Sequence, residues 1–184
     1  NGWRGDSTDG AGFLRDLRER HDFKAHGRRG LLLGAGGAAR AVAFALADAG
    51  IGELMIANRT PARATALAAA MGDSARACAW NNLATLRDVD LVINATAAGH
   101  AGSVLDLPAG VIRATTLCYD LSYGAAAVAF LRWAHASGAT RASDGLGMLV
   151  EQAAESFVLW HGVQPATMPV HAELRTLLAA QTHT

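Results

Sequence analysis

The chain has 184 residues, which suits one ordinary globular domain and leaves little room for two. Hydrophobic residues make up 51% of it and charged residues 17%, a balance that supplies a large core and excludes an intrinsically disordered chain. The 16 Lys and Arg residues balance the 16 Asp and Glu residues, so the chain lacks the basic excess that attracts nucleic acid or acidic membranes. We therefore expect a local pocket for a small molecule, with neither a nucleic-acid nor a membrane partner.

The sequence predicts no membrane-spanning helix, no metal site and no disulfide. Arg40 and Asp48 interrupt the longest apolar stretch, which falls short of the about 20 residues of a membrane helix, and no signal peptide is visible, so we expect a cytoplasmic protein. Cys78 and Cys118 lie far apart and near no second metal-type ligand, which predicts two buried thiols rather than a disulfide or a zinc site. The seven histidines include no pair spaced four residues apart, and no metal site is predicted.

The first 71 residues alternate between helical and strand patterns. Phe13 and Leu17 lie at helical spacing and predict a short amphipathic helix that ends at Arg20. Thr60 and Pro61 supply an N-cap and a first-turn proline for a later helix. After the first helix, the patterns predict a strand at 30–33, a helix at 38–49, a strand at 54–57 and a helix at 60–71.

The alternation continues as far as Asp144 and Gly145, after which the chain has only helical patterns. The remaining predicted elements are strands at 76–79, 91–93, 116–119 and 140–142 and helices at 83–86, 125–136, 146–160 and 170–180. Strands that are apolar on both faces and alternate with helices predict a parallel sheet covered on both sides. The expected fold is an α/β, Rossmann-like doubly wound parallel sheet with additional C-terminal helices.

A glycine-rich turn follows the first predicted strand and opens the first long helix. Gly34, Gly36 and Ala39 form a G-x-G-x-x-A pattern. The first glycine permits the tight turn, the second lets the backbone approach a pyrophosphate, and the alanine allows the helix to pack closely on the strand. Backbone N–H groups at the helix start then face the phosphates. The pattern predicts a dinucleotide site at Gly34, Ala35, Gly36, Gly37 and Ala38, the alternative being a tight turn without a ligand.

The residues at the end of the second predicted strand indicate whether the site prefers NAD or NADP. Folds that bind NAD usually place Asp or Glu about 20 residues after the glycines, where the carboxylate holds the ribose hydroxyls. This chain instead has Asn58, Arg59 and Thr60, and Arg63 follows one helical turn later. Two guanidinium groups fit a 2′-phosphate, and no carboxylate is present to repel it, so NADP is predicted over NAD. The alternative is a pair of solvated arginines, although cations at a helix start oppose the helix dipole.

A loop of small residues at 94–99 follows the strand predicted at 91–93. In a doubly wound sheet, the loops beyond the carboxyl ends of the strands line the ligand crevice. We therefore expect Thr96 to border the ribose and nicotinamide end of the cofactor. The alternative is a plain loop whose side chains contact no ligand.

Several separated stretches of the chain, taken in order, resemble the C-terminal, NADP-binding portion of the shikimate dehydrogenase family. They are GDSTDGAGFL at 5–14, GAGGAARAV at 34–42, NRTPAR at 58–63, INAT at 93–96, YDLSY at 119–123 and DGLGMLVEQAAESFVLWHG at 144–162. The last stretch is the most specific, because no general constraint on nucleotide binding requires it. The resemblance implies an oxidoreductase of aromatic amino-acid biosynthesis (the chorismate pathway) that interconverts shikimate and 3-dehydroshikimate with NADP.

The resemblance also implies which residues hold the cofactor. The turn at 34–38 would hold the pyrophosphate, in agreement with the spacing argument. Leu121 and Gly145 would lie against the nicotinamide, with Met148 packed nearby, although Met148 is also an ordinary core residue of a helix. The positions that would bind the adenosine phosphate are Asn58, Arg59, Thr60, Pro61, Ala62 and Arg63.

For the substrate, the resemblance implies contacts from Asp9, Tyr123 and Gln152. Asp9 and Gln152 would bind ring hydroxyls, and Asp9 would also be catalytic, because in this family it pairs with a lysine that acts in proton transfer. From the residues alone, Asp9 fits equally well as a helix N-cap, and Tyr123 as a packed aromatic side chain. Gln152 lies within an apolar helix, where a buried amide needs partners.

The chain departs from the family at several places, including Ser7, where Asn is usual, and His100, where hydrophobic residues are common. Two further departures matter more. It has alanine at 125–127, where a Thr-Pro pair usually begins the helix, and it lacks the family's N-terminal substrate domain with its catalytic lysine, since Lys24 matches nothing in that motif. We therefore expect a fragment that binds cofactor but is inactive alone. Its expected parts are a helix at 1–29 that links to the missing domain, an NADP-binding domain at 30–145, and helices at 146–184 that pack back towards the missing domain.

Two other functions stay open from the sequence. One is a quinate/shikimate dehydrogenase with relaxed cofactor use, and the other is a non-catalytic NADP-sensing module. The oligomeric state is expected to be a monomer or a homodimer, because no self-complementary surface is readable from the sequence.

Overall fold

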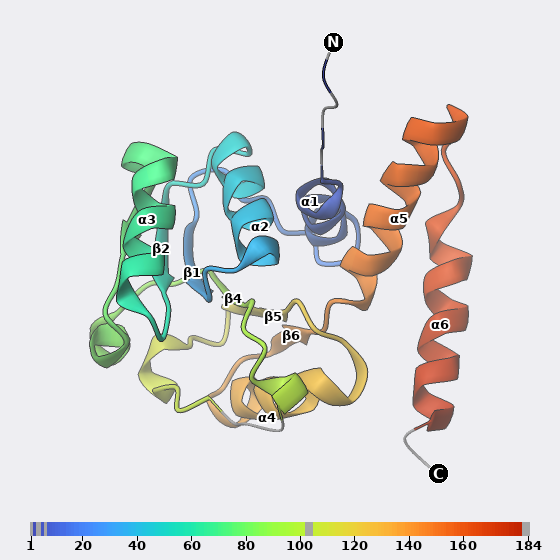
Figure 1. Cartoon of the computed structure of the whole chain (residues 1–184). Helices are drawn as coiled ribbons and strands as arrows, with labels where there is room; N and C mark the ends of the chain where they lie inside the picture. The colour runs from blue at the N-terminus through green and yellow to red at the C-terminus, as the bar shows by residue number, and fades with distance from the viewer. Residues whose placement is uncertain (1, 3–4, 6, 102–104, 182–184) are drawn as a thin grey trace.

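The computed structural model describes residues 2, 5, 7–101 and 105–181. Within this part of the chain, six strands form one sheet in the order β3-β2-β1-β4-β5-β6, and every neighbouring pair is parallel (Figure 1). This is the strand order of a Rossmann-type doubly wound sheet, so the predicted fold class is confirmed. The strands are β1 (Arg29–Leu33), β2 (Glu53–Ala57), β3 (Ala75–Ala77), β4 (Leu91–Asn94), β5 (Leu117–Asp120) and β6 (Arg141–Ser143).

The central strands are buried on both faces, which explains their unbroken apolar sequences. In β1, Leu32 belongs to one core cluster, whereas Leu31 and Leu33 belong to the other. Helices α1 (Asp9–Glu19), α2 (Gly37–Asp48), α3 (Pro61–Met71) and the start of α5 (Leu146–His161) cover the first face. Helix α4 (Val128–Ala136) and two short 3-10 helices, Trp80–Thr85 and Ala109–Val111, cover the second (Figure 1).

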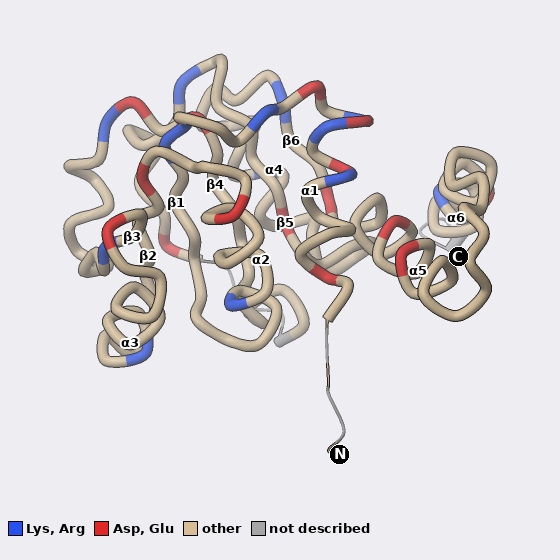
Figure 2. Tube along the Cα trace, turned by 90° about the horizontal axis from the view of Figure 1, so that it is seen from above, with Lys and Arg blue, Asp and Glu red and all other residues tan. Residues whose placement is uncertain are grey.

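Helix α1 lies between α2 and α5 and is part of the first core (Figure 1). Its Phe13 and Leu17 are almost fully buried, and the Phe13 ring packs edge-on against Tyr119 of β5 with the centroids 5.1 Å apart. Helix α6 (Thr167–Gln181) instead packs beside α5, away from the sheet. Figure 2 shows basic and acidic positions interspersed along α1, and acidic positions on the side of α5 that faces it.

The observed elements differ from the predicted ones mainly at their ends. The segment predicted as a helix at 125–136 begins with a 3-10 turn, Gly124–Ala127, before α4, and the short helical stretch expected at 83–86 is the 3-10 helix Trp80–Thr85. Helix α6 begins at Thr167 rather than at Val170, because Pro169 lies in the first helical turn, where a missing N–H costs no hydrogen bond.

The two cysteines have different environments. Cys118, in β5, is fully buried, and burial raises the pKa of its thiol to about 12. Cys78 follows the edge strand β3 and is only half-buried, so the prediction of two buried thiols is wrong for Cys78. Across the described residues, no helix combines the length and apolarity needed to cross a membrane, and no cluster of three or more His, Cys, Asp or Glu side chains could hold a metal ion.

Candidate functional site

The candidate site lies at the carboxyl ends of β1 and β4, the neighbouring strands at which the strand order changes direction. Ligands of open α/β sheets bind at this switch point. Gly34 follows β1 with a φ of +113°, and a Cβ there would lie 2.7 Å from the Ala95 carbonyl oxygen after β4. The turn that joins β1 to α2 therefore requires glycine at this position. The Gly34 N–H donates to the Ala57 carbonyl at 2.8 Å, which ties the turn to the end of β2.

Gly36 and Gly37 form the exposed start of α2. Gly36 occupies the N-cap position with a φ of −86°, which any residue can adopt, and no atom of the described protein lies within 4 Å of a Cβ at either glycine. The protein itself therefore gives no steric reason for glycine here. The two positions leave backbone N–H groups at a helix N-terminus open to a closely approaching anion, as a dinucleotide pyrophosphate requires. Ala39, which follows them, is fully buried, as close packing of α2 on the sheet demands.

The segment predicted to hold the adenosine phosphate joins β2 to α3. Asn58 donates its amide to the Thr60 carbonyl at 2.9 Å, which shapes the turn before Pro61. Arg59 and Arg63 are exposed, and in the part of the chain that the structure describes neither guanidinium has a hydrogen-bond or ion-pair partner. No acidic side chain lies in the first turn of α3. Two unpaired cations at a helix N-terminus are unfavourable alone, so the segment is suited to an anionic ligand.

A buried polar network at the ends of β4 and β5 fixes the loop that carries Thr96. Asn94 donates its side-chain amide to Asp120 at 2.8 Å, and the Asn94 side-chain carbonyl oxygen accepts the Thr96 hydroxyl at 2.8 Å. The other Asp120 oxygen accepts the Ser122 N–H at 2.8 Å. Burial raises the pKa of the Asp120 carboxyl above its ordinary value, although the hydrogen bonds from Ser122 and Asn94 oppose this shift. Sequence reasoning missed Asp120, although a polar residue ending each of two neighbouring buried strands is a usable signal.

Three residues predicted to lie at the nicotinamide end come together between β5 and α5. A Cβ at Gly145 would overlap the Leu121 carbonyl oxygen, so the two loops are in direct contact and position 145 admits only glycine. Met148 is 7% exposed and belongs to the first core cluster, and its N–H donates to the Tyr119 hydroxyl at 3.3 Å. Its burial agrees with the alternative interpretation of Met148 as a core residue.

The predicted substrate residues lie on two groups of elements. Asp9 is in the first turn of α1 and Thr8 takes the N-cap position, so the interpretation of Asp9 as the N-cap is wrong. The Thr8 hydroxyl contacts the Gln152 side-chain oxygen at 3.1 Å, and a Cβ at Gly12 would overlap the Gln152 backbone. The start of α1 and the middle of α5 are thus in close contact. Tyr123, after β5, is 42% exposed, which excludes a role as a packed core aromatic.

Comparison with known proteins identifies the family. The model for shikimate / quinate 5-dehydrogenase matches residues 17–103, and the model for the shikimate 5'-dehydrogenase C-terminal domain matches residues 145–175. The chain belongs to the shikimate dehydrogenase family. Curated relatives named shikimate dehydrogenase (NADP(+)) include one from Xanthomonas campestris pv. campestris (strain B100), 55% identical over 94% of this chain, and one from Xylella fastidiosa (strain M12), 52% identical over 95% of it. The chain spans 62% and 63% of their lengths.

Solved structures agree with this assignment. An Ael1 enzyme from Pseudomonas putida has a TM-score of 0.84 and 43% identity, over 91% of this chain and 62% of its own. A shikimate 5-dehydrogenase from Thermus thermophilus, in complex with NADP(H) and shikimate, has a TM-score of 0.75 and 35% identity, over 94% of this chain and 63% of its own. A quinate dehydrogenase from Corynebacterium glutamicum, in complex with NAD, has a TM-score of 0.81 and 26% identity, over 94% of this chain and 63% of its own.

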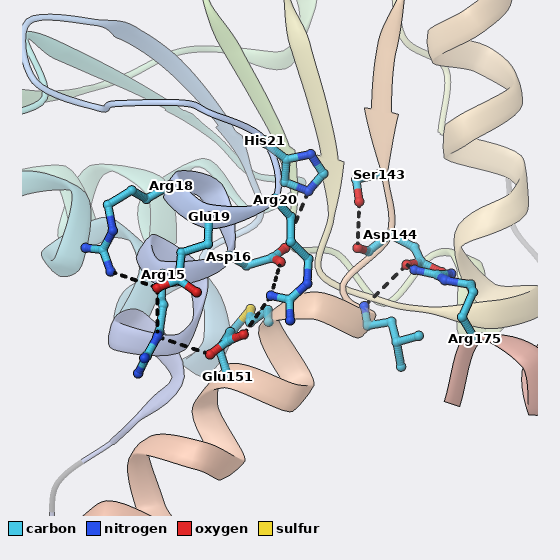
Figure 3. A network of polar contacts seen from close by, with 12 residues as sticks. Arg15, Asp16, Arg18, Glu19, Arg20, His21, Ser143, Asp144, Glu151 and Arg175 are labelled. Atoms are coloured by element: carbon cyan, nitrogen blue, oxygen red, sulfur yellow. Dashed lines mark hydrogen bonds and ion pairs between the residues drawn. The ribbon is translucent and has the colours of Figure 1, made fainter. Parts of the chain in front are cut away.

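In this member of the shikimate dehydrogenase family, a buried ionic network joins α1 to α5 (Figure 3), and a hydrogen bond from Tyr119 connects the network to β5. The Tyr119 hydroxyl donates to Asp16 at 2.6 Å, and Arg20 pairs with Asp16 at 3.0 Å and with Glu151 at 2.7 Å. Burial works to raise the pKa of Asp16, but its interactions with His21, Tyr119 and Arg20 together outweigh burial and hold the pKa below its ordinary value. Sequence reasoning missed this network, because its charges resemble the polar face of a solvated helix.

Proposed function

We propose that this chain binds NADP(H) and belongs to an NADP-dependent shikimate dehydrogenase, which oxidises shikimate reversibly to 3-dehydroshikimate. The assignment of NADP as cofactor rests on two features: the exposed glycine pair at the start of α2, and the guanidinium groups of Arg59 and Arg63, which have no partner in the part of the chain that the structure describes. The relatives named as NADP(+) enzymes support both the cofactor and the reaction. The cytoplasmic location expected from the sequence belongs to the same proposal.

The residues present fit the cofactor along the strand ends. The turn at 34–38 would bind the pyrophosphate through backbone N–H groups, and the segment at 58–63 would bind the 2′-phosphate through its two arginines. Thr96, Leu121, Gly145 and Met148 would border the ribose and the nicotinamide. When bound, NADP supplies a nicotinamide that accepts hydride from the substrate carbon.

The substrate would lie between the start of α1 and the loop after β5. Asp9 would accept a hydrogen bond from a ring hydroxyl, Gln152 would bind a second hydroxyl, and Tyr123 would contact the ring from the rim. The proton that leaves the oxidised hydroxyl needs a base. The family resemblance assigns this role to a lysine. Lys24, the only lysine of the chain, lies beyond the opposite end of α1 from Asp9, and the 11 residues of α1 span about 16 Å, so we propose that the isolated chain is inactive.

Arg59 is expected to contribute to the selectivity for NADP over NAD. Replacing Arg59 with Ala is expected to weaken NADPH binding about 10- to 100-fold, because a charge-assisted contact to phosphate contributes about 1.5–3 kcal/mol. NADH lacks the 2′-phosphate, so its affinity should stay the same. Calorimetric titration of the chain with each nucleotide measures both. Arg132→Ala, an exposed arginine on α4 on the other face of the sheet, is the matched control and should change neither affinity.

Equal binding of NADPH and NADH by the unaltered chain would contradict the phosphate site and favour the alternative with relaxed cofactor use. Among the solved relatives, the quinate dehydrogenase structure in complex with NAD gives that alternative its support. Loss of selectivity in Arg132→Ala would show that any lost surface cation has the same effect.

A serine at position 36 distinguishes a ligand-binding role of Gly36 from a structural role. Gly36→Ser keeps a good N-cap for α2, and its Cβ meets no protein atom, so the free energy of unfolding should change by less than about 0.5 kcal/mol. NADPH affinity should nevertheless fall by about 10-fold or more, because the side chain occupies the space that the pyrophosphate needs. Urea unfolding and calorimetric titration give the two values. Unchanged NADPH affinity would mean that the turn is purely structural.

A further inference from the structure

An ion pair outside the proposed binding residues holds together the two loops at the nicotinamide end. Asp144 lies between β6 and α5 and is 6% exposed. Its two carboxylate oxygens accept a two-pronged pair of hydrogen bonds from Arg175 of α6, at 2.8 and 2.7 Å (Figure 3). The same carboxylate accepts the backbone N–H groups of Gly124 and Leu146, each at 3.3 Å. One buried carboxylate thus joins the loop after β5, the start of α5, and α6.

The two loops that meet at Asp144 carry the residues proposed for the nicotinamide and the substrate rim. Leu121 and Tyr123 lie in the loop that ends at Gly124, while Gly145 and Met148 lie at the start of α5. A second hydrogen bond, from the Gly145 N–H to the Ser122 carbonyl at 2.9 Å, fixes the loops to each other. Gly124 adopts a φ of +62°, which its bond to Asp144 helps to hold. A change at Asp144 is therefore expected to affect both loops.

Arg175 lies on α6 and is the exposed member of this group of residues. Its side chain is 45% exposed, whereas the Asp144 side chain is 6% exposed. Burial works to raise the pKa of Asp144, but the hydrogen bonds and charge of Arg175, together with the backbone N–H groups of Leu146 and Gly124, outweigh burial and hold that pKa below its ordinary value. Without Arg175, the buried carboxylate would keep, among the described residues, only the two backbone N–H contacts at 3.3 Å, and it would hold the two loops less firmly.

We propose that Arg175 is a positioning residue, which acts through Asp144 to place the loop 121–124 against the start of α5 for hydride transfer. The proposal rests on the proposed shikimate dehydrogenase function. Small misplacements near the reacting atoms cost catalysis heavily, so Arg175→Ala should lower kcat/KM for shikimate by about 10-fold or more. The Kd for NADPH should change by less than about 3-fold, because the phosphate sites lie on β1 and β2, away from α6. A general loss of stability would instead weaken both.

The experiment compares Arg175→Ala and Arg175→Lys with Glu173→Ala in the natural protein that contains this chain. Glu173 is an exposed neighbour on α6 and serves as the matched control. Lysine keeps the charge but cannot form the two-pronged pair, so Arg175→Lys should lie between alanine and wild type in kcat/KM. Hydrogen exchange should be at least about 10-fold faster at the amides of Gly124 and Leu146 in Arg175→Ala, and unchanged in β1.

The outcomes separate this proposal from the function on which it rests. If the wild type is active and Arg175→Ala has the same kcat/KM, the positioning role is overturned and the proposed function still holds. Equal losses of kcat/KM and of NADPH affinity would also overturn the positioning role, because they would indicate a residue that only stabilises the fold. Unchanged hydrogen exchange at the amides of Gly124 and Leu146 would overturn it as well. A wild type that binds no NADPH and oxidises no shikimate overturns both proposals.

Discussion

Replacing Glu151 with Ala is expected to lower the free energy of unfolding by about 3–5 kcal/mol, because the change removes one of the two carboxylates that neutralise the nearly buried Arg20. The Glu151 side chain is fully buried in α5, where it pairs with Arg20 at 2.7 Å and with Arg15 at 3.3 Å (Figure 3). Arg20 is only 10% exposed, and two of its nitrogens, Nε and Nη2, already lack a hydrogen-bond partner within the described structure. Without Glu151, Asp16 would be the one counter-charge left to Arg20 among the described residues.

Glu155 provides the matched control, because it lies one helical turn further along α5 and also pairs with Arg15, at 2.7 Å. Its side chain is 31% exposed, so water screens the pair, and Glu155→Ala should cost less than about 1 kcal/mol. Urea unfolding of the two variants at neutral pH gives the comparison. Equal effects would show that the Glu151 pairs stabilise the protein no more than surface pairs do.

The sequence predicted the sheet well because the decisive signals are local. The apolar strands at β1, β2 and β4 are short and bounded by glycine or polar residues, and each was expected within one or two residues of its observed bounds. The turn at Gly34 was equally predictable, because its strand-turn-helix context lies within a few residues. These signals required no knowledge of distant parts of the chain.

The contacts that could not be predicted join residues far apart in sequence. Asp144 and Arg175 are 31 positions apart, and Tyr119 and Asp16 are 103 apart, so no helical or strand spacing relates the members of either pair. A charged residue in a helix is usually solvated, and the sequence alone gives no sign that Glu151 is fully buried. Close helix packing decides this burial, since a Cβ at Gly147 would overlap the Asp16 carboxylate.

Some residues of the candidate site were predictable from local sequence patterns, and others were not. Arg59 and Arg63 were identified from their distance to the glycine turn, because the βαβ unit fixes where the second strand ends. The substrate positions came only from the family resemblance, because they lie at separate ends of the chain. The structure places the start of α1 against Gln152 through Thr8, whereas Tyr123 lies in the separate loop after β5.

Asp9→Asn is expected to lower kcat for shikimate oxidation by about 100-fold or more in the natural protein that contains this chain, with NADPH affinity unchanged. Asn keeps the shape of the side chain but removes the negative charge that a proton-transfer partner would need, and such roles contribute about 10²–10⁴ in rate. The change should barely affect folding, because Asp9 is partly exposed and Thr8, not Asp9, holds the N-cap of α1.

Steady-state kinetics of shikimate oxidation, together with an NADPH titration of the same variant, test the role of Asp9. Asp48→Asn, an exposed carboxylate at the end of α2, is the matched control and should alter neither value. Unchanged kcat in Asp9→Asn would remove Asp9 from the catalytic machinery. A raised KM with unchanged kcat would reduce Asp9 to a binding contact, because uniform binding of substrate and transition state affects KM alone. Only a loss of kcat without a loss of cofactor affinity therefore supports the catalytic role.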